Sequence, residues 1–439
     1  MSAAVRVVVL DHNGGELTLE CLRRLHRTDW PRDALELVLV DNGSTDDVVA
    51  RARQEFPELR VLVSDHNRGF AGGNNLALRD LAGVDHVALV NNDVLVEPGW
   101  LGPLVAALDA DEMLGAASPK ILLSSPMLDV ELRVENSLRR GRGDGRKLGV
   151  RLSGVRAGGK DCSRLARPVR GFWGPEHGPG SESESEYQWT AEEALLRVPV
   201  PEAPASPDAR GCELRLAADR ATPVQLRSGN DGVDHVVTTE PAWYPVTLAG
   251  DPFEVINNTG SVVLDDGYGA DRGYLERDAG QYDVEEDVPA WCGATVLLRA
   301  AYLQDTGLFD ERLFLYYEDL ELSLRGRARG WRYRYVPDSV VRHVHSATSV
   351  EGSALATHYN ERNRLLVLTR HAGPAAGVRA TMRYLLVTGS YFRRDVVSPL
   401  LRGERPRWET VRRRLRAVAG FLRLAPVMTP WPGSRRALR

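Results

Sequence analysis

The sequence predicts an α/β protein: a mostly parallel sheet with helices on both faces, carrying a β-rich insert and a helical C-terminal tail. Three observations predict this fold class. Short apolar runs alternate with helix-patterned segments over residues 5–124, and the alternation returns over 253–371. Between them, residues 125–252 lose helical periodicity and gain Gly, Pro and Ser between short β-like runs. Beyond residue 371 the chain is rich in Arg and poor in acids.

A chain of 439 residues is too long for one small core, so we expect more than one domain. We place the first half of the main domain at 1–124 and its second half at 253–371. The inserted β-rich module occupies 125–252, and its sequence does not indicate a function. The basic helical extension occupies 372–439.

The first half of the main domain shows four strand–helix alternations. Strands are predicted at 5–10, 35–40, 59–63 and 86–90, and helices at 17–26, 47–56, 76–81 and 98–109. In an open parallel sheet of this kind, ligands bind at the carboxyl ends of the strands.

The later elements are predicted in the same way. In the second half we expect a strand at 295–298, a helix after Glu318, strands at 332–336 and 340–344 separated by a Pro337-Asp338 turn, and a helix at 359–370. In the insert we expect strands at 195–200, 212–216, 233–238 and 243–248.

Composition excludes several classes of protein. Hydrophobic residues make up 43% of the chain and charged residues 26%, which is typical of a soluble globular protein. The four cysteines are scattered without a CxxC pair, which argues against a zinc site or a disulfide framework and fits a reducing cytosol. The N-terminus runs into an apolar strand rather than a signal peptide, and no apolar run approaches the length of a membrane span. We therefore expect a cytoplasmic location.

Polar clusters follow three of the predicted strands. Asp11-His12-Asn13, Asp41-Asn42-Gly43 and Asn91-Asn92-Asp93 each begin where an apolar run ends. Because the carboxyl ends of parallel strands meet at one edge of a sheet, we expect the three clusters to line one site. Asn92 belongs to this site with its neighbours.

Asp93 is a candidate metal ligand. A carboxylate just past a buried strand can bind Mg²⁺ or Mn²⁺ in a shell shared with substrate phosphates, and the neutral imidazole of His343 could complete that shell. The alternatives are an Asx turn at the strand end and an ordinary polar histidine.

Two further motifs fit a nucleotide. Asp41 can accept hydrogen bonds from a base edge, although Ser44 after it also fits a simple helix cap. The run from Asn67 to Asn75 contains Gly69, Gly72 and Gly73, which allow close backbone approach to a ligand before a helix N-terminus that favours phosphate.

The adjacent acids Glu318 and Asp319 follow a dense aromatic and apolar run. Carboxylates beside aromatic side chains are partly desolvated, which raises the pKa and suits a general base. Acids also favour the start of a helix through its dipole, so the pattern alone leaves both readings open.

The tail contains one basic amphipathic segment. Residues 411–424 have helical periodicity with arginines beside apolar residues. Such a helix suits the anionic surface of a membrane, and it equally suits a helix packed on its own domain with a solvated cationic face. Nucleic acid is disfavoured, because the net charge is −4 and stacking aromatics are not interleaved with the arginines.

Taken together and in this order, the motifs resemble the inverting family 2 glycosyltransferases of GT-A fold, a Rossmann-like fold. The likeness is closest to bacterial rhamnosyltransferase-like members and more distant to galactofuranosyltransferases. The matching segments are 7–13, 40–46, 67–75, 91–93, 309–319, Gly330-Trp331, His343 and 360–365. They cover about 5–124 and 254–371, so the resemblance leaves out the insert and puts the acceptor's identity in doubt.

The resemblance implies roles for named residues. Residues 1–124 would be the nucleotide-sugar-binding half and 253–371 the acceptor and catalytic half. Asp319 would be the catalytic base, supported by Glu318. The nucleotide sugar would be bound by Asp11, Asn13, Asp41, Asn67, Gly69, Gly73, Asn74 and Asn92. Asp93 and His343 would hold the metal, with Asn91 in place of the family's first acid, and Trp291, Cys292 and Gly293 would line the acceptor side.

The implied activity is transfer of a rhamnose-like or galactofuranose-like sugar from a dTDP or UDP donor, assisted by Mg²⁺ or Mn²⁺. The acceptor would be a cell-wall polysaccharide or lipid-linked glycan at the inner membrane face, with the basic tail as a candidate peripheral membrane contact. A nucleotidyltransferase is disfavoured because Asp11 to Gly15 contains no Lys or Arg. A third hypothesis is a non-catalytic carbohydrate- or nucleotide-binding protein that works through the insert.

Overall fold

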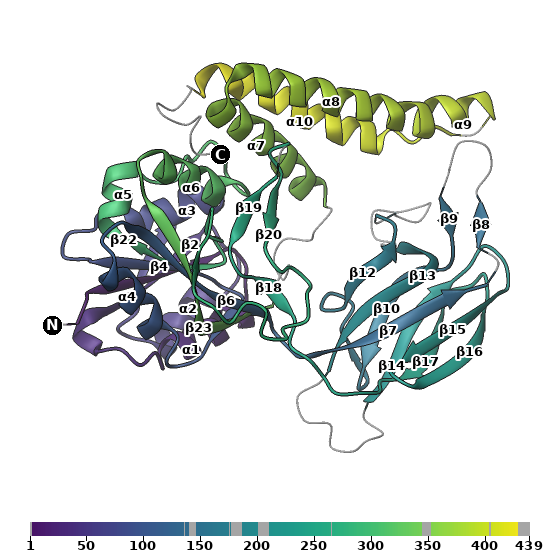
Figure 1. Cartoon of the computed structure of the whole chain (residues 1–439), viewed down its shortest axis with the longest axis horizontal. Helices are drawn as coiled ribbons and strands as arrows, with labels where there is room; N and C mark the ends of the chain where they lie inside the picture. Colours follow the sequence, from purple (N-terminus) through teal and green to yellow (C-terminus); the bar gives the residue numbers. More distant parts are fainter. Residues whose placement is uncertain are drawn as a thin grey trace. The chain divides into compact units, whose positions relative to one another are not determined.

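The computed structural model describes residues 2–135, 137–139, 146–174, 176, 187–200, 210–264, 266–344, 353–403 and 405–428. The chain divides into two compact units (Figure 1). Unit 1 comprises Met1–Leu122 and Ile256–Arg439, and unit 2 comprises Leu123–Val255. The division falls within a few residues of the predicted boundaries at 125 and 252.

Unit 1 is built on a ten-stranded sheet whose first half is parallel. Its strands run in the order β4-β1-β2-β3. The strands are β1 (Val5–Asp11), β2 (Leu35–Asn42), β3 (Arg60–Ser64) and β4 (His86–Asn91), and the helices between them are α1 (Glu16–Leu25), α2 (Val48–Glu55) and α3 (Gly69–Leu78), with a short 3₁₀ turn at Arg32–Ala34. Asp11 pairs with Asp41 in the register, so the ends of β1 and β2 are level.

The second half of the sheet is mainly antiparallel. Here β22 pairs antiparallel with β4 and with β6, and β23 pairs antiparallel with β21 and β5. The strands are β5 (Val94–Val96), β6 (Leu114–Leu123), β18 (Ile256–Asn258), β21 (Glu286–Asp287), β22 (Thr295–Arg299) and β23 (Arg332–His343). A mixed α/β sheet with helices is confirmed, but a mostly parallel one is wrong for this half. A buried strand is apolar whether the adjacent strand is parallel or antiparallel to it. The sequence therefore did not reveal the relative direction of the strands.

Helices cover both faces of the sheet. Val5, Val7 and Val9 of β1 pack with α1, α2 and α4 (Leu101–Ala110), whereas Val8 packs with α3, α5 (Ala300–Thr306) and α6 (Glu318–Ala328). Successive side chains of a strand point to opposite faces, so β1 is apolar from Val7 to Leu10 because both of its faces are buried.

Two predicted elements differ from the structure. The helix expected at 76–81 begins seven residues earlier, so that the glycine-rich motif is the helix α3 itself. The Pro337-Asp338 turn is absent, because β23 runs through it. Pro337 lies between the residues that pair with β21 and those that pair with β5, so its missing N–H costs neither pairing a hydrogen bond.

Unit 2 is an antiparallel β module with its own core. Its main sheet runs β16-β15-β7-β13-β10-β14-β17. The strands are β7 (Met127–Val134), β10 (Arg151–Ala157), β11 (Lys160–Asp161), β12 (Arg167–Phe172), β13 (Gln188–Pro199), β14 (Gly211–Ala217), β15 (Thr222–Ser228), β16 (Asp231–Val237) and β17 (Ala242–Thr247), with a small hairpin β8–β9 (Leu138–Arg139 and Lys147–Leu148). His235 of β16 contacts the Pro245 carbonyl oxygen of β17 at 2.8 Å, so the two edge strands meet and the sheet curls around its apolar side chains.

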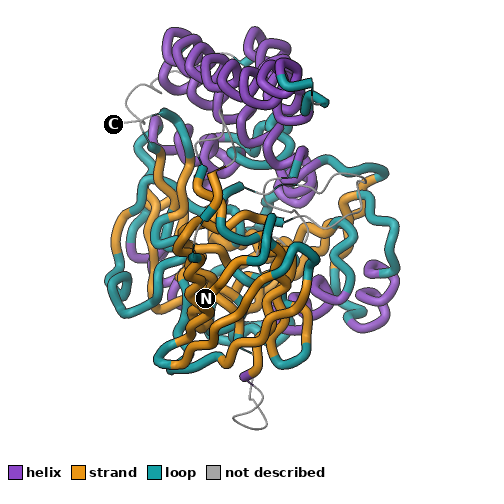
Figure 2. Tube along the Cα trace, turned by 90° about the vertical axis from the view of Figure 1, so that its right-hand side faces the viewer, coloured by secondary structure: helices purple, strands orange, loops and turns teal. Residues whose placement is uncertain are grey.

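Helices dominate the C-terminal part of unit 1 and form a layer of their own (Figure 2). They are α7 (Ala354–Ala372), α8 (Pro374–Phe392), a π-helical turn (Arg393–Val397), α9 (Ser398–Leu401), α10 (Glu409–Leu424) and a 3₁₀ turn (Ala425–Val427). A core shared by Leu320, Leu366 and Phe421 joins α6, α7 and α10. The sequence analysis did not predict α8. Among the described helices, none combines the length and the apolar character needed to span a bilayer.

Candidate active site

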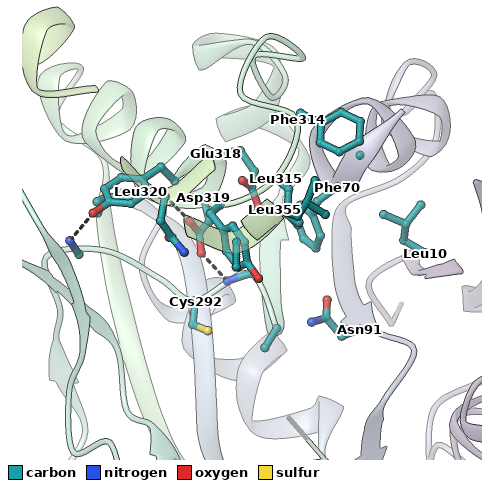
Figure 3. A pocket seen from close by; sticks show the side chains of 18 of the residues that line it. Leu10, Phe70, Asn91, Cys292, Phe314, Leu315, Glu318, Asp319, Leu320 and Leu355 are labelled. Carbon is teal, nitrogen blue, oxygen red and sulfur yellow. Dashed lines mark hydrogen bonds between the residues drawn. The ribbon is translucent and has the colours of Figure 1, made fainter. Parts of the chain in front are cut away.

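Unit 1 contains a cavity of about 650 Å³ at the edge of the sheet where β1, β2 and β4 end. One side is lined by Leu10, Asn42 and Asn91 at the strand ends, and the other by Cys292, Gly293 and residues 314–320. Figure 3 shows Glu318, Asp319 and Cys292 on one side, with Leu10 and Asn91 across the cavity from them. The predicted residues that line the cavity are Asn67, Gly69, Asn92, Cys292, Gly293, Glu318 and Asp319.

Asp11 lies beneath this cavity rather than in its wall. It is fully buried, and its carboxylate accepts hydrogen bonds from Thr18 (2.5 Å), Asn92 (3.1 Å) and Ser44 (3.0 Å). These donors come from α1 and from the loops after β4 and β2. Asp11 therefore ties the three polar clusters together by hydrogen bonds.

Asp41 and Asn13 shape turns in this structure. Asp41 accepts from the backbone N–H of Ser44 at 2.8 Å, and Asn13 accepts from the backbone N–H of Thr45 at 2.7 Å. Neither is among the residues that line the cavity. Asn42, which was expected at the site only as a member of the cluster 41–43 and was given no role of its own, does line it.

Asn42 fastens the glycine-rich segment to the end of β2. Its amide donates to Asn67 Oδ1 and to the Gly69 carbonyl oxygen, both at 3.1 Å, and its oxygen accepts from the Arg68 N–H at 2.8 Å. These three hydrogen bonds fix the Asn42 side chain, which holds Asn67 and Gly69 at the cavity wall.

The glycines of this segment allow close packing between parts of the protein. A Cβ on Gly69 would lie 2.2 Å from the Phe314 carbonyl oxygen, and one on Gly73 would lie 2.4 Å from a methyl group of Leu10. Gly69 also has a φ of +69°. Gly73 and the buried Asn74, whose amide donates to the Phe70 carbonyl oxygen, do not line the cavity. These contacts explain Gly69 and Gly73 without a phosphate.

The loop before the acidic pair has an unusual backbone. Phe314, Tyr316 and Tyr317 have φ values of +64°, +65° and +70°. The left-handed region is costly for large side chains, so three such residues within four positions persist only where surrounding contacts hold them.

Helix α7 supplies those contacts. The amide of Asn363 donates to the carbonyl oxygens of Leu313, Leu315 and Tyr316 at 2.7–2.9 Å. The guanidinium of Arg362 donates to the Leu313 carbonyl oxygen at 2.9 Å. Both side chains are buried. The segment 360–365 therefore holds the strained loop that presents the two acids.

Asp319 is oriented by backbone donors. Its carboxylate accepts from the N–H of Gly293 at 2.9 Å and from its neighbour Leu320 at 2.7 Å. Burial raises its pKa, the two N–H donors oppose the shift, and the negative charge of Asp271 adds to it. Asp271 lies in the cavity wall on the hairpin β19 (Ser261–Val263) and β20 (Gly269–Asp271), and it was not predicted as a site residue.

Glu318 has a different environment. It is 5% exposed, and its Oε2 has no hydrogen-bond partner among the described residues. Burial and the neighbouring charge of Asp319 raise the pKa of Glu318 well above its usual range. Both effects disfavour the ionised form of Glu318, so of the two acids Glu318 is the one whose protonated form is favoured.

The predicted acceptor segment lies partly in the cavity wall. Cys292 and Gly293 line it, but Trp291 is fully buried and packs edge-on against Phe309. Burial and the charges of Asp271 and Asp319 raise the pKa of the Cys292 thiol well above its usual range, so it is no nucleophile.

Asp93 and His343 lie together just past the ends of β4 and β23. Asp93 Oδ1 is 3.0 Å from His343 Nε2, and His343 Nδ1 is 2.9 Å from Asn257 Oδ1. One ring nitrogen of His343 therefore faces the Asp93 carboxylate, and the other faces the side-chain amide of Asn257.

A divalent cation fits these two donors. Ligands at about 2.1 Å on adjacent corners of an octahedron are about 3.0 Å apart, which is the spacing of Asp93 Oδ1 and His343 Nε2. No group of three or more His, Cys, Asp or Glu side chains that could hold a metal occurs in the described part of the chain. Water or a ligand would therefore have to supply the remaining corners.

Two family descriptions match the two halves of unit 1. "Glycosyl transferase family 2" matches residues 7–124, and "Glycosyltransferase like family 2" matches 257–365. Together they span more than half of the chain, and both leave out unit 2.

Curated relatives match over shorter stretches. N-acetylglucosaminyl-diphospho-decaprenol L-rhamnosyltransferase of Mycobacterium tuberculosis is 34% identical over 131 residues, which is 29% of this chain and 39% of the relative. Glycosyltransferase AglE of Haloferax volcanii is 27% identical over 100 residues, 22% of this chain and 33% of the relative. The matches thus cover about two fifths or less of these relatives' length.

Solved structures match loosely. GalNAc-T7 with UDP, GalNAc and Mn²⁺ has 14% identity and a TM-score of 0.43, covering 84% of this chain and 48% of that one. Mannosyltransferase PcManGT from Pyrobaculum calidifontis, in complex with GDP-Man and Mn²⁺, has 16% identity and a TM-score of 0.41, covering 96% and 88%. Such TM-scores support no conclusion about the site. The two family matches, at the predicted motifs, place this chain in glycosyltransferase family 2.

Proposed function

We propose that this protein transfers a sugar, with inversion, from a nucleoside-diphosphate sugar to a hydroxyl group of a glycan or lipid-linked glycan. The observation that carries the proposal is the placement of Asp319. It lies in the cavity wall with both oxygens held by backbone N–H groups, across from the strand ends at Leu10 and Asn91.

Asp319 is the proposed general base. It takes the proton of the acceptor hydroxyl as the hydroxyl oxygen forms a bond to the anomeric carbon. The bond from that carbon to the diphosphate breaks, and its electron pair leaves with the diphosphate. A single displacement inverts the stereochemistry and needs no nucleophile on the protein.

Glu318 keeps a proton in this scheme. A protonated Glu318 adds no negative charge beside Asp319, so Asp319 stays ionised and able to accept the acceptor's proton. The unpartnered Oε2 of Glu318 also leaves one polar atom for a substrate hydroxyl.

Asp93 and His343 are the proposed ligands of Mg²⁺ or Mn²⁺, with Asn257 orienting the imidazole. When bound, such an ion stabilises the negative charge of a departing diphosphate. Asn42, Asn67, Gly69 and Asn92 would contact the nucleotide sugar from the cavity wall. Asp11, Asn13, Asp41, Gly73 and Asn74 would support them from behind.

The substrates are proposed from the rhamnosyltransferase relative, whose name specifies a diphosphate-linked decaprenol acceptor. By that likeness the donor sugar is rhamnose or a similar sugar, and the acceptor is a lipid-linked glycan. The resemblance of the sequence motifs adds dTDP or UDP as the proposed carrier and the inner face of the membrane as the proposed place of transfer. Cys292, Gly293 and the hairpin β19–β20 would form the acceptor side.

Thermal unfolding with UDP, dTDP, GDP and CDP, each with and without Mn²⁺, tests the donor site. A ligand that binds only the folded state raises the midpoint. We expect one nucleotide to raise it with Mn²⁺ and the rise to vanish in Asp93→Ala. Asp319→Asn should keep the nucleotide response and lose transfer. No response to any of the four nucleotides would overturn the proposal.

A further inference from the structure

Helix α8 exposes a continuous apolar stripe. Val378, Met382, Leu385 and Phe392 follow one another at spacings of four, three and seven residues, and all four are exposed, as is the adjacent Leu386 at 76%. On a helix this spacing places side chains on one face, here along a helix of about 28 Å. A stripe of this length is rare on the surface of a monomer.

The packing of α8 and α10 explains which helix exposes its apolar side. Gly377, Tyr384 and Thr388 face the protein and are buried, which leaves the stripe of α8 uncovered. The basic helix expected to present an apolar face is α10, but its Val418 and Phe421 are buried against the rest of unit 1. Part of the apolar side of α10 is therefore packed on unit 1, whereas its Leu415 and Leu422 stay exposed. Figure 1 shows α8 and α10 side by side, as their contacts require.

The charged residues of α8 that border the stripe are all positive. Helix α8 has no acidic residue, and its Arg379 and Arg383 are exposed. Over residues 374–428 the sequence has 12 arginines and 3 acids, a net charge of +9, in a chain whose total is −4. An exposed apolar stripe bordered by arginines is the pattern of a helix that lies in the interface of an anionic membrane.

We propose that α8 docks on an anionic lipid bilayer, with the stripe in the headgroup region and the arginines toward the lipid phosphates. A second copy of the chain is a poorer occupant, because a self-complementary contact through α8 would bring two segments of charge +9 together. The inference does not depend on sugar transfer.

Sedimentation of the full chain with vesicles tests this docking. We expect binding to vesicles of phosphatidylcholine with 30% phosphatidylglycerol, on the order of tenfold weaker binding to phosphatidylcholine alone, and weakening by salt. The double variant Met382→Glu, Leu386→Glu should bind the mixed vesicles at least about tenfold more weakly. Both positions are exposed, so the fold should be unaffected.

The control is Val236→Glu, which adds one glutamate, half the charge of the double variant, at a 60% exposed valine of unit 2. It should bind vesicles as the wild type does. Equal loss in Val236→Glu, or vesicle binding that survives Met382→Glu, Leu386→Glu, would overturn the docking. So would light scattering that shows a dimer broken by the double variant together with no vesicle binding by the wild type.

Discussion

At the scale of single residues, the two adjacent acids have opposite surroundings. Asp319 accepts two backbone N–H groups, whereas the Oε2 of Glu318 is buried without a partner among the described residues. A third acid, Glu321, is also buried but pairs with Arg325 at 2.8 Å and with Arg370 at 3.0 Å. Helix α6 thus contains one oriented acid, one unpaired acid and one paired acid.

We predict that Glu318→Gln stabilises the protein at pH 8. The pKa of Glu318 is raised in the folded state, so folding takes up a proton above the unfolded pKa and stability falls as pH rises through this window. Removing the carboxyl group should add about 1 to 3 kcal/mol at pH 8, shrinking toward pH 4.5. Urea unfolding at several pH values measures this.

Glu321→Gln is the matched control, because it should have the opposite sign. Its ion pairs lower the pKa of Glu321, so their stabilisation is present above the unfolded pKa and is lost as pH falls through the folded pKa. At pH 8 we expect a loss of about 3 to 5 kcal/mol. A Glu318→Gln protein that is also less stable at pH 8 would contradict the unpaired state of Glu318.

Asp271 should set part of the pH dependence of transfer. As a base, Asp319 acts in its ionised form, so kcat/KM rises with pH through its pKa. The charge of Asp271 helps to raise that pKa, after burial. We predict that Asp271→Asn moves the acid limb of the kcat/KM profile to lower pH. An unchanged acid limb would show that the limb does not report Asp319.

At the scale of elements, helix α7 holds the loop before α6 in its strained conformation. The loop contains three left-handed aromatic residues, and the amide of Asn363 accounts for three hydrogen bonds to its carbonyl groups. Gly69 lets the same loop approach α3 closely. The motifs at 67–75 and 360–365 therefore have a structural reason in common, which is to hold the loop that presents Asp319.

We predict that Asn363→Ala costs about 2 to 4 kcal/mol of stability, since the carbonyl groups of Leu315 and Tyr316 lose their side-chain donor and that of Leu313 keeps only Arg362. Transfer should fall more than nucleotide binding, because the loop positions the base and not the nucleotide wall. Urea unfolding and transfer assays measure the two effects. Asn230→Ala, in an exposed turn of unit 2, controls for loss of an amide and should change neither. Full transfer by a folded Asn363→Ala protein would refute the positioning role.

At the scale of the whole molecule, the two positions of the main domain between which the insert lies are neighbours in space. Leu122 and Ile256 are paired in the antiparallel contact of β6 with β18, and the Leu123 N–H donates to the Val255 carbonyl oxygen at 2.8 Å. The lining residues of the cavity all belong to unit 1, and unit 2 has a separate core.

We predict that replacing residues 124–254 with a four-residue Gly-Ser linker leaves a folded unit 1. The ends to be joined are already neighbours, so a short linker closes the gap without strain. The shortened chain should keep the midpoint shift given by nucleotide and Mn²⁺ and lose it on Asp93→Ala. A folded shortened chain without the shift would show that unit 2 contributes to the donor site.

The sequence by itself determined the elements whose apolar periodicity is set locally. Apart from Arg6 and His86, the strands at 5–10 and 86–90 are apolar because both faces are buried, and polar clusters after them mark the edge where the cavity lies. It also indicated the insert, where turns and short strands replace helices. The family matches rest on the same motifs.

Only the tertiary structure decided which of these residues face the cavity. Asp11, Asp41 and Asn42 have similar side chains at neighbouring strand ends, yet Asn42 alone of the three lines the wall, because Asp11 accepts from Thr18 of α1 and Asp41 from the turn at Ser44. Likewise α10 buries Val418 and Phe421 of its apolar side, whereas the apolar stripe of α8 stays exposed. Sequence periodicity records that a face is apolar, and contacts between distant segments decide what covers it.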